Sequence, residues 1–125
     1  MSDRKNEAAW KYDARLIRVV DGDTVDAMLD LGFSTHRKVR IRFYGIDAPE
    51  SRTKDLEEKA LGKAATERLV EILDLECGKF VVRSHGIGKF GRCLGELFTD
   101  SLGDTSVNQT LLDEGHGVSY HGGKR

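Results

Sequence analysis

The stretch that decides the fold is Val39-Arg40-Ile41-Arg42-Phe43-Tyr44-Gly45-Ile46-Asp47-Ala48-Pro49-Glu50. Its first half alternates between apolar residues and arginine or tyrosine, and successive side chains of a strand point to opposite faces. The alternation predicts a half-buried strand with a basic outer face, which stops at Gly45. Pro49 restricts its own backbone and that of the residue before it, so Asp47 and Glu50 follow on a stiffened loop. Arginines beside carboxylates on a rigid loop suit a site that holds a metal ion and a phosphate together.

The residues before this stretch predict two further strands. Residues 12–20 and 24–31 each alternate, and Asp21-Gly22-Asp23 between them is a turn signal. A second turn over residues 32–37 leads into the strand that begins near Lys38. We therefore expect three strands joined as antiparallel hairpins.

The periodicity changes after the acidic loop. Leu61, Ala65, Leu69 and Leu73 recur every four residues. This spacing predicts an amphipathic helix over residues 58–75, with these four side chains facing the core.

Two more strands and a short helix complete the pattern. Strands are expected over residues 79–84 and 93–99, joined by a glycine-rich hairpin loop. Ser106 and Gln109 have the spacing of a capping box, and Gly115 suits the position just past a helix end. Three strands, a helix, two strands and a helix predict an α+β fold, a five-stranded Greek-key β-barrel of the OB type.

Length and composition indicate one domain over residues 1–125, with a core at about 11–118 and flexible tails at 1–10 and 119–125. The net charge is −1, so any binding of nucleic acid must depend on local placement of charge. No apolar run is long enough to span a membrane, and no signal-peptide core is present. We expect a monomer in the cytoplasm, or otherwise intracellular, with no membrane partner.

The cysteines and histidines are assigned no chemistry. Cys77 and Cys93 lack zinc spacing and are too few for a disulfide scaffold, so we expect two free, mostly buried thiols. The histidines show no metal-binding spacing either, and we expect them on the surface at His36, His85, His116 and His121.

Two acidic turns form the candidate metal site. Asp21 and Asp23 lie in the first turn, Asp47 and Glu50 lie in the second, and hairpin pairing would let the turns approach each other. Three or four carboxylates would suit Ca²⁺, which takes several oxygen ligands in irregular geometry. Each turn taken alone is better explained as an ordinary polar turn, and only both turns together beside Arg40 and Arg42 favour a metal site.

Two arginines are candidate phosphate ligands. The planar fork of Arg42 can bind a phosphate through two hydrogen bonds, and Arg92 follows Gly91 at a hairpin tip where an anion can approach. Arg42 taken singly could be a solvated cation of an exposed sheet face, and Arg92 taken singly is better explained as part of a surface turn.

These motifs together resemble the staphylococcal nuclease (thermonuclease) family. The matching pieces run in the family's order over about residues 14–117, and they are Val20–Val25, Arg42–Glu50, Lys89–Gly95, and Val107–Asn108 with Leu111 and Gly115. The resemblance implies an OB-fold barrel with helices and a Ca²⁺-dependent phosphodiesterase that acts on DNA and RNA.

The resemblance also implies roles for the acidic residues. Asp23 and Asp47 would bind Ca²⁺ directly, Ala48 would offer its backbone carbonyl, and Asp21 would lie behind these ligands. Glu50 would hold the attacking water, either as general base or by orienting it.

The basic and aromatic residues would face the substrate. Arg42 and Arg92 would bind the scissile phosphate and stabilise the charge that grows on it. Lys89 would contact a neighbouring phosphate, Phe90 would stack on a base, and Tyr120 is the nearest counterpart of the family's substrate-side tyrosines.

Two departures from the family pattern affect the site. Gly88 stands where the family often has an acidic residue, and Ala48 stands where the best-known member has threonine. Two alternatives therefore remain, a non-catalytic nucleic-acid- or protein-binding module of the same fold, and an OB-type ligand binder. The complete set of acidic residues and arginines favours the enzyme, because an inactive module has no chemical reason to keep it.

Overall fold

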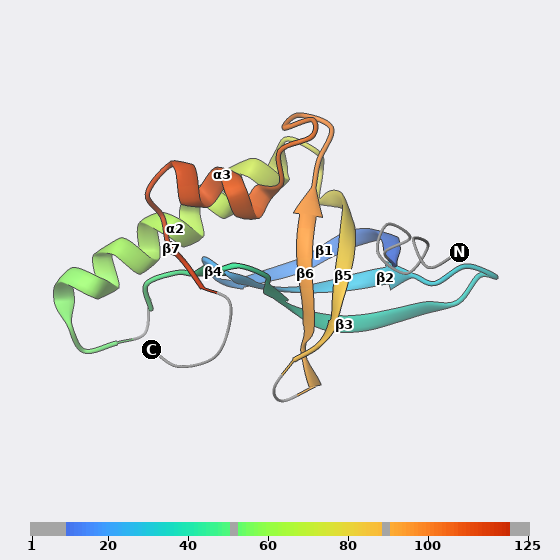
Figure 1. Ribbon diagram of the computed structural model, residues 1–125, viewed down its shortest axis with the longest axis horizontal. Coiled ribbons are helices and arrows are strands. Elements are labelled where there is room, and N and C mark those ends of the chain that lie inside the picture. Colours follow the sequence, from blue (N-terminus) through green and yellow to red (C-terminus); the bar gives the residue numbers. More distant parts are fainter. Residues whose placement is uncertain (1–9, 51–52, 89–90, 121–125) are drawn as a thin grey trace.

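The computed structural model describes residues 10–50, 53–88 and 91–120. Five strands form a closed barrel in the order β1–β2–β3–β6–β5, and every neighbouring pair is antiparallel except β3 and β6 (Figure 1). The strands are β1 Lys11–Asp21, β2 Thr24–Asp30, β3 His36–Phe43, β5 Lys79–Ile87 and β6 Cys93–Phe98. This architecture confirms the predicted OB-type barrel and the antiparallel order of its first three strands.

Both helices lie on the same side of the barrel, α2 at Leu56–Asp74 and α3 at Val107–Asp113 (Figure 1). The carboxylate of Asp55 caps α2 by accepting hydrogen bonds from two backbone N–H groups of its first turn. Ser106 caps α3 by accepting from the backbone N–H of Gln109. The Gln109 side chain instead donates to Asp113, so only half of the predicted capping box forms.

The predicted core face of α2 is correct except at its start. Ala65, Leu69 and Leu73 are fully buried, whereas Leu61 is 59% exposed and Gly62 takes the core position. A step of four residues overshoots one helical turn by about 40°. The error accumulates over the helix, so Leu61 is rotated toward solvent when the later residues face the barrel.

A buried asparagine joins α3 to the barrel. The side-chain amide of Asn108 donates to the carbonyls of Tyr44 and Gly95 at 2.8 and 3.0 Å, and its oxygen accepts from Leu97 N–H at 3.1 Å. The Tyr44 carbonyl comes just after β3, and Gly95 and Leu97 lie on β6. The Asn108 side chain therefore fixes α3 beside the point where β3 ends.

A small second sheet was not predicted. Strands β4 (Ile46–Asp47) and β7 (Val118–Ser119) pair antiparallel, and the Tyr120 N–H donates to the carbonyl of Gly45. Ser119 and Tyr120, assigned to a tail by the sequence, therefore lie against the loop that carries Asp47. Residues 121–125 fall outside the described residues.

Three further expectations about single residues are corrected. Both cysteines are free as expected, but only Cys93 is buried, whereas Cys77 is exposed in a tight turn with φ of 55°. Burial raises the pKa of the Cys93 thiol. His85 and His116 are partly buried rather than surface residues.

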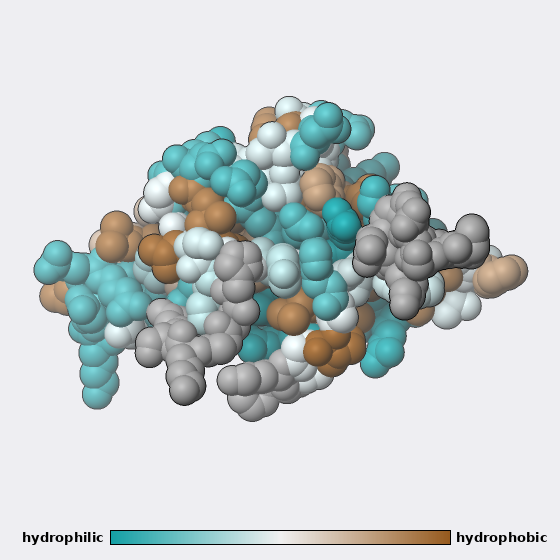
Figure 2. All heavy atoms as spheres, in the orientation of Figure 1, coloured by the Kyte–Doolittle hydropathy of each residue, from teal (hydrophilic) through white to brown (hydrophobic). Residues whose placement is uncertain are grey.

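Within the described chain, neither helix is long and apolar enough to cross a membrane. On the face drawn in Figure 2, apolar residues occur in separate small groups among hydrophilic ones.

Candidate active site

The two acidic turns meet, as the sequence predicts. The backbone N–H of Ala48 donates a 2.9 Å hydrogen bond to Oδ2 of Asp23, which is itself buried. Gly22 lies at the same junction, because a Cβ on it would come within 2.7 Å of the Ala65 Cβ on α2 and 3.1 Å of the Ala48 Cβ. The first turn therefore packs tightly between α2 and the second turn.

Arg42 occupies the centre of this junction. Its Nη1 donates to the carbonyls of Phe43 and Ile46 at 2.9 and 2.7 Å, and its Nη2 donates to Asp47 Oδ1 at 3.3 Å. Nη1 also lies 3.6 Å from Asp23 Oδ2. With only 14% of its side chain exposed, the guanidinium is held in one place by groups from β3, β4 and the turn before β2.

The four candidate carboxylates do not gather into one cluster. Among residues 10–50, 53–88 and 91–120, no three His, Cys, Asp or Glu side chains come together as a metal-binding group. Asp23 and Asp47 both approach Arg42, whereas Glu50 is exposed and its N–H donates to the carboxylate of Glu58. Asp23 and Asp47 are therefore not left to repel each other, because the largely buried Arg42 lies between them and offsets their charge.

Arg92 lies immediately before β6, next to the strand that carries Arg42. Arg42 pairs with Leu94 in the parallel register of β3 and β6, so Arg92 is two residues upstream of that partner. Its carbonyl accepts a 2.7 Å hydrogen bond from the N–H of Gly88 across the hairpin. The two predicted substrate contacts at the tip, Lys89 and Phe90, lie outside the described residues.

Tyr120 does reach the site. Its ring centroid is 5.9 Å from Cζ of Arg42, within the range of a cation–π contact. The strand pair β4–β7 brings it there, which explains why sequence spacing alone gave no reason to place it beside Arg42.

Three residues beside the end of β3 were not predicted as part of the site. The rings of Tyr44 and His85 stack in parallel with centroids 3.8 Å apart, and His85 Nε2 lies 2.7 Å from the carboxylate of Glu96. Tyr44 comes directly after β3, two residues beyond Arg42, and the strand alternation predicted it on the same face as Arg42. The partners on β5 and β6 follow only from the strand register, which the sequence does not reveal.

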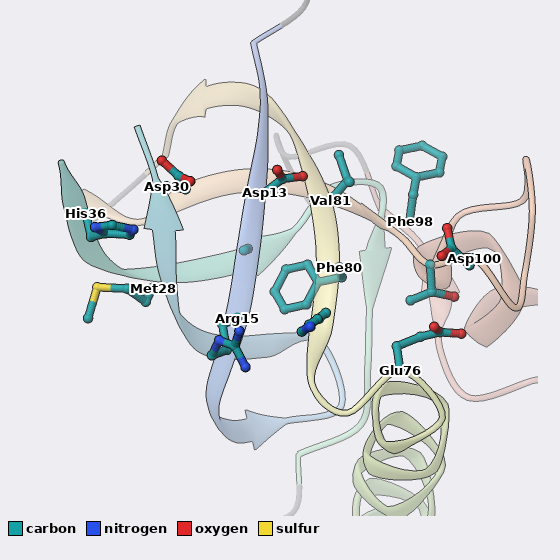
Figure 3. A pocket seen from close by; sticks show the side chains of 13 residues that line it. Asp13, Arg15, Met28, Asp30, His36, Glu76, Phe80, Val81, Phe98 and Asp100 are labelled. Carbon is teal, nitrogen blue, oxygen red and sulfur yellow. The ribbon is translucent and has the colours of Figure 1, made fainter. Parts of the chain in front are cut away.

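A hollow in the described surface lies elsewhere. It has a volume of about 490 Å³. Its lining includes Asp13 on β1, and Asp30 and His36 at the ends of β2 and β3 that lie away from Asp23 and Arg42 (Figure 3). Four carboxylates line it, and no candidate site residue does.

A family model described as "Staphylococcal nuclease homologue" matches residues 40–124. Among curated proteins, the chain is 26% identical over 119 residues to a micrococcal nuclease of Shigella flexneri, covering 90% of this chain and 61% of that protein. It is 32% identical over 120 residues to endonuclease YhcR of Bacillus subtilis (strain 168), covering 90% of this chain and 9% of that protein.

A plant protein is similar too. The chain is 31% identical over 87 residues to the staphylococcal-like nuclease CAN1 of Arabidopsis thaliana, covering 67% of this chain and 24% of that protein. The chain spans less than two thirds of the length of each of these three relatives.

Proposed function

Because this chain belongs to the staphylococcal nuclease family, we propose that it is a Ca²⁺-dependent nuclease that hydrolyses phosphodiester bonds of DNA, RNA or both. The observation that carries the proposal is the position of Arg42, between Asp23 and Asp47 where the two acidic turns meet. This junction supplies an anion-binding group and hard oxygen donors side by side, which metal-assisted phosphodiester hydrolysis requires.

The arginines would stabilise the charge that develops during hydrolysis. In-line attack on a diester builds negative charge on the phosphoryl oxygens, and groups already in position stabilise that charge best. Carbonyls and carboxylates hold Arg42 in place before any substrate arrives. We assign Arg92 the same role because it lies immediately before β6, the strand next to that of Arg42.

The donor set at the junction fits a hard cation. Asp23, Asp47 and the carbonyl of Ala48 offer only oxygen atoms, which Ca²⁺ prefers, and its shell of about six to eight ligands would be completed by water and substrate. When bound, Ca²⁺ supplies positive charge beside the phosphoryl oxygens. Arg42 already balances much of the charge of Asp23 and Asp47. We therefore expect Ca²⁺ to bind weakly at this junction.

The remaining residues would surround this junction. Glu50 would accept a proton from the attacking water or orient it, which its exposed position on the second turn permits. Asp21 would support the metal ligands from the first turn. Lys89, Phe90 and Tyr120 would contact the substrate, and the ring of Tyr120 beside Arg42 supports this role for Tyr120.

The test is cleavage of labelled single-stranded DNA and RNA by the wild-type protein with Ca²⁺, with Mg²⁺ and with EDTA. We expect cleavage with Ca²⁺, much less with Mg²⁺ because that ion demands stricter octahedral geometry, and none with EDTA. Cleavage that persists in EDTA would contradict the metal dependence alone. Binding of either nucleic acid without cleavage under all three conditions would replace the enzyme with a non-catalytic binding module.

A further inference from the structure

Three cations follow one another along the outer face of β3. Lys38, Arg40 and Arg42 alternate with residues that face the barrel interior, of which Ile41 is fully buried. A step of two residues along a strand covers about 6.6–6.8 Å, so the row extends about 13 Å from Arg42 toward the β2–β3 hairpin. Figure 1 shows this hairpin reaching past the rest of the barrel.

The charge of Arg42 is offset by Asp23 and Asp47, so an excess of positive charge must lie further along the row. Asp26, opposite Arg40 on β2, is buried and accepts hydrogen bonds from both Arg40 and Arg18 at 2.8–3.1 Å. These arginines hold the pKa of Asp26 well below its usual range. Asp21 also acts on Arg40, so Arg18, Lys38 and Arg40 face two carboxylates and keep one excess positive charge. Of the Arg40 and Arg18 side chains, 43% and 64% remain exposed.

Positive charge at this place contrasts with the rest of the molecule. The whole chain has a net charge of −1. Beyond Lys38 the outer face becomes acidic, at the hollow where Figure 3 shows Asp13 and Asp30. The cationic row is therefore bounded, with the candidate active site at one end and carboxylates past the other.

The geometry points to a track for the substrate strand. We propose that the outer face of β3 from Arg42 to Lys38 binds successive phosphates of a single-stranded nucleic acid beyond the bond that is cleaved, a proposal that rests on the proposed function. Evenly spaced cations along an extended strand match the evenly spaced charges of an extended polynucleotide. The preferred substrate would then be several nucleotides long rather than a dinucleotide.

Lys38 and Arg37 provide a matched pair of variants. Both are exposed and adjacent, but they point to opposite sides of β3, and neither makes a side-chain hydrogen bond or ion pair with another described residue. Replacing either with alanine removes one positive charge and no described contact. Only Lys38→Ala should affect a strand bound along the row.

The experiment measures binding of a labelled single strand of about 10 nucleotides by fluorescence anisotropy in EDTA, over a range of salt concentrations. Loss of one phosphate contact lowers the slope of log K against log salt by about 0.7 and weakens binding about fivefold near 0.1 M salt. We expect both changes for Lys38→Ala and neither for Arg37→Ala. With a dinucleotide substrate in Ca²⁺, KM should be the same for both variants and the wild type.

If the affinity and its salt dependence change equally in the two variants, or change in neither, the proposed phosphate-binding row on β3 is wrong. The proposed function is tested separately by cleavage. If the wild type cleaves and both variants bind the longer strand like the wild type, the nuclease stands and the track fails. If the wild type binds with the expected Lys38 dependence and cleaves nothing, the track stands and the nuclease fails.

Discussion

The backbone N–H of Ala48 donates a hydrogen bond to the carboxylate of Asp23, 25 residues earlier in the chain. This bond joins the turn after β1 to the loop after β3, so two carboxylate-bearing segments become one site. Gly22 makes the approach possible, because it leaves room for both Ala48 and Ala65. The position of the site therefore depends on close packing as well as on charge.

Gly22→Ala should displace the first turn. The new Cβ would lie 2.7 Å from the Ala65 Cβ, a distance that requires the turn or α2 to move. We expect a loss of stability of about 1–3 kcal/mol, as for other overpacked sites, together with a fall in cleavage rate. The double variant Gly22→Ala with Ala65→Gly should recover much of the rate, and urea unfolding with a cleavage assay measures both effects. A single variant as active and stable as wild type would show that the packing at this junction is loose.

Arg42→Lys should slow turnover more than it weakens binding. Lysine keeps the charge but cannot make the bidentate contacts of a guanidinium, and it loses the bonds to Phe43 and Ile46 that hold the group in place. Loss of one preorganised donor predicts a fall in kcat of about 10²-fold or more. Arg37→Lys, on the opposite side of β3, is the control and should leave kcat unchanged. Normal turnover in Arg42→Lys would remove this arginine from the chemistry.

Much of this arrangement could be predicted from local patterns, and the rest depends on tertiary contacts. Alternation around Ile41 and the turn at Gly22 identified the strands and the two acidic turns, because both signals lie within a few residues. The pairing of β4 with β7 involves only two residues on each strand, too short for a periodic signal. The position of Arg42 between two carboxylates likewise follows only when β2 and β4 are in place.

Leu69 and Leu61 test the register of α2. Leu69 is fully buried against the barrel, so Leu69→Ala should cost about 2–5 kcal/mol. Leu61 lies on the exposed side of the helix, so Leu61→Ala should change stability by no more than about 0.5 kcal/mol. Denaturant unfolding of both variants measures the difference, and equal losses would mean that the helix is rotated from the position described.

Asp26 should make stability depend on pH. Its folded-state pKa is lowered by hydrogen bonds from Arg40 and Arg18, so its contribution is fully present above the ordinary aspartate pKa and is lost as the pH falls toward the folded value. The stability gap between wild type and Asp26→Asn should therefore be constant near neutral pH and narrow below about pH 4. Urea unfolding across pH 3–7 provides the comparison. A gap that stays constant down to pH 3 would show that the carboxylate is not stabilised by these arginines.

The most direct test of the account is the dependence of cleavage rate on Ca²⁺ concentration for wild type and Asp23→Asn. Asparagine keeps the shape and the oxygen that accepts from Ala48 N–H, so the junction should remain folded while one ligand charge is lost. We predict a saturable Ca²⁺ dependence for the wild type and almost no cleavage by Asp23→Asn at the same concentrations. Equal rates for the two proteins at every Ca²⁺ concentration would contradict a Ca²⁺-dependent active site at the junction of the two turns.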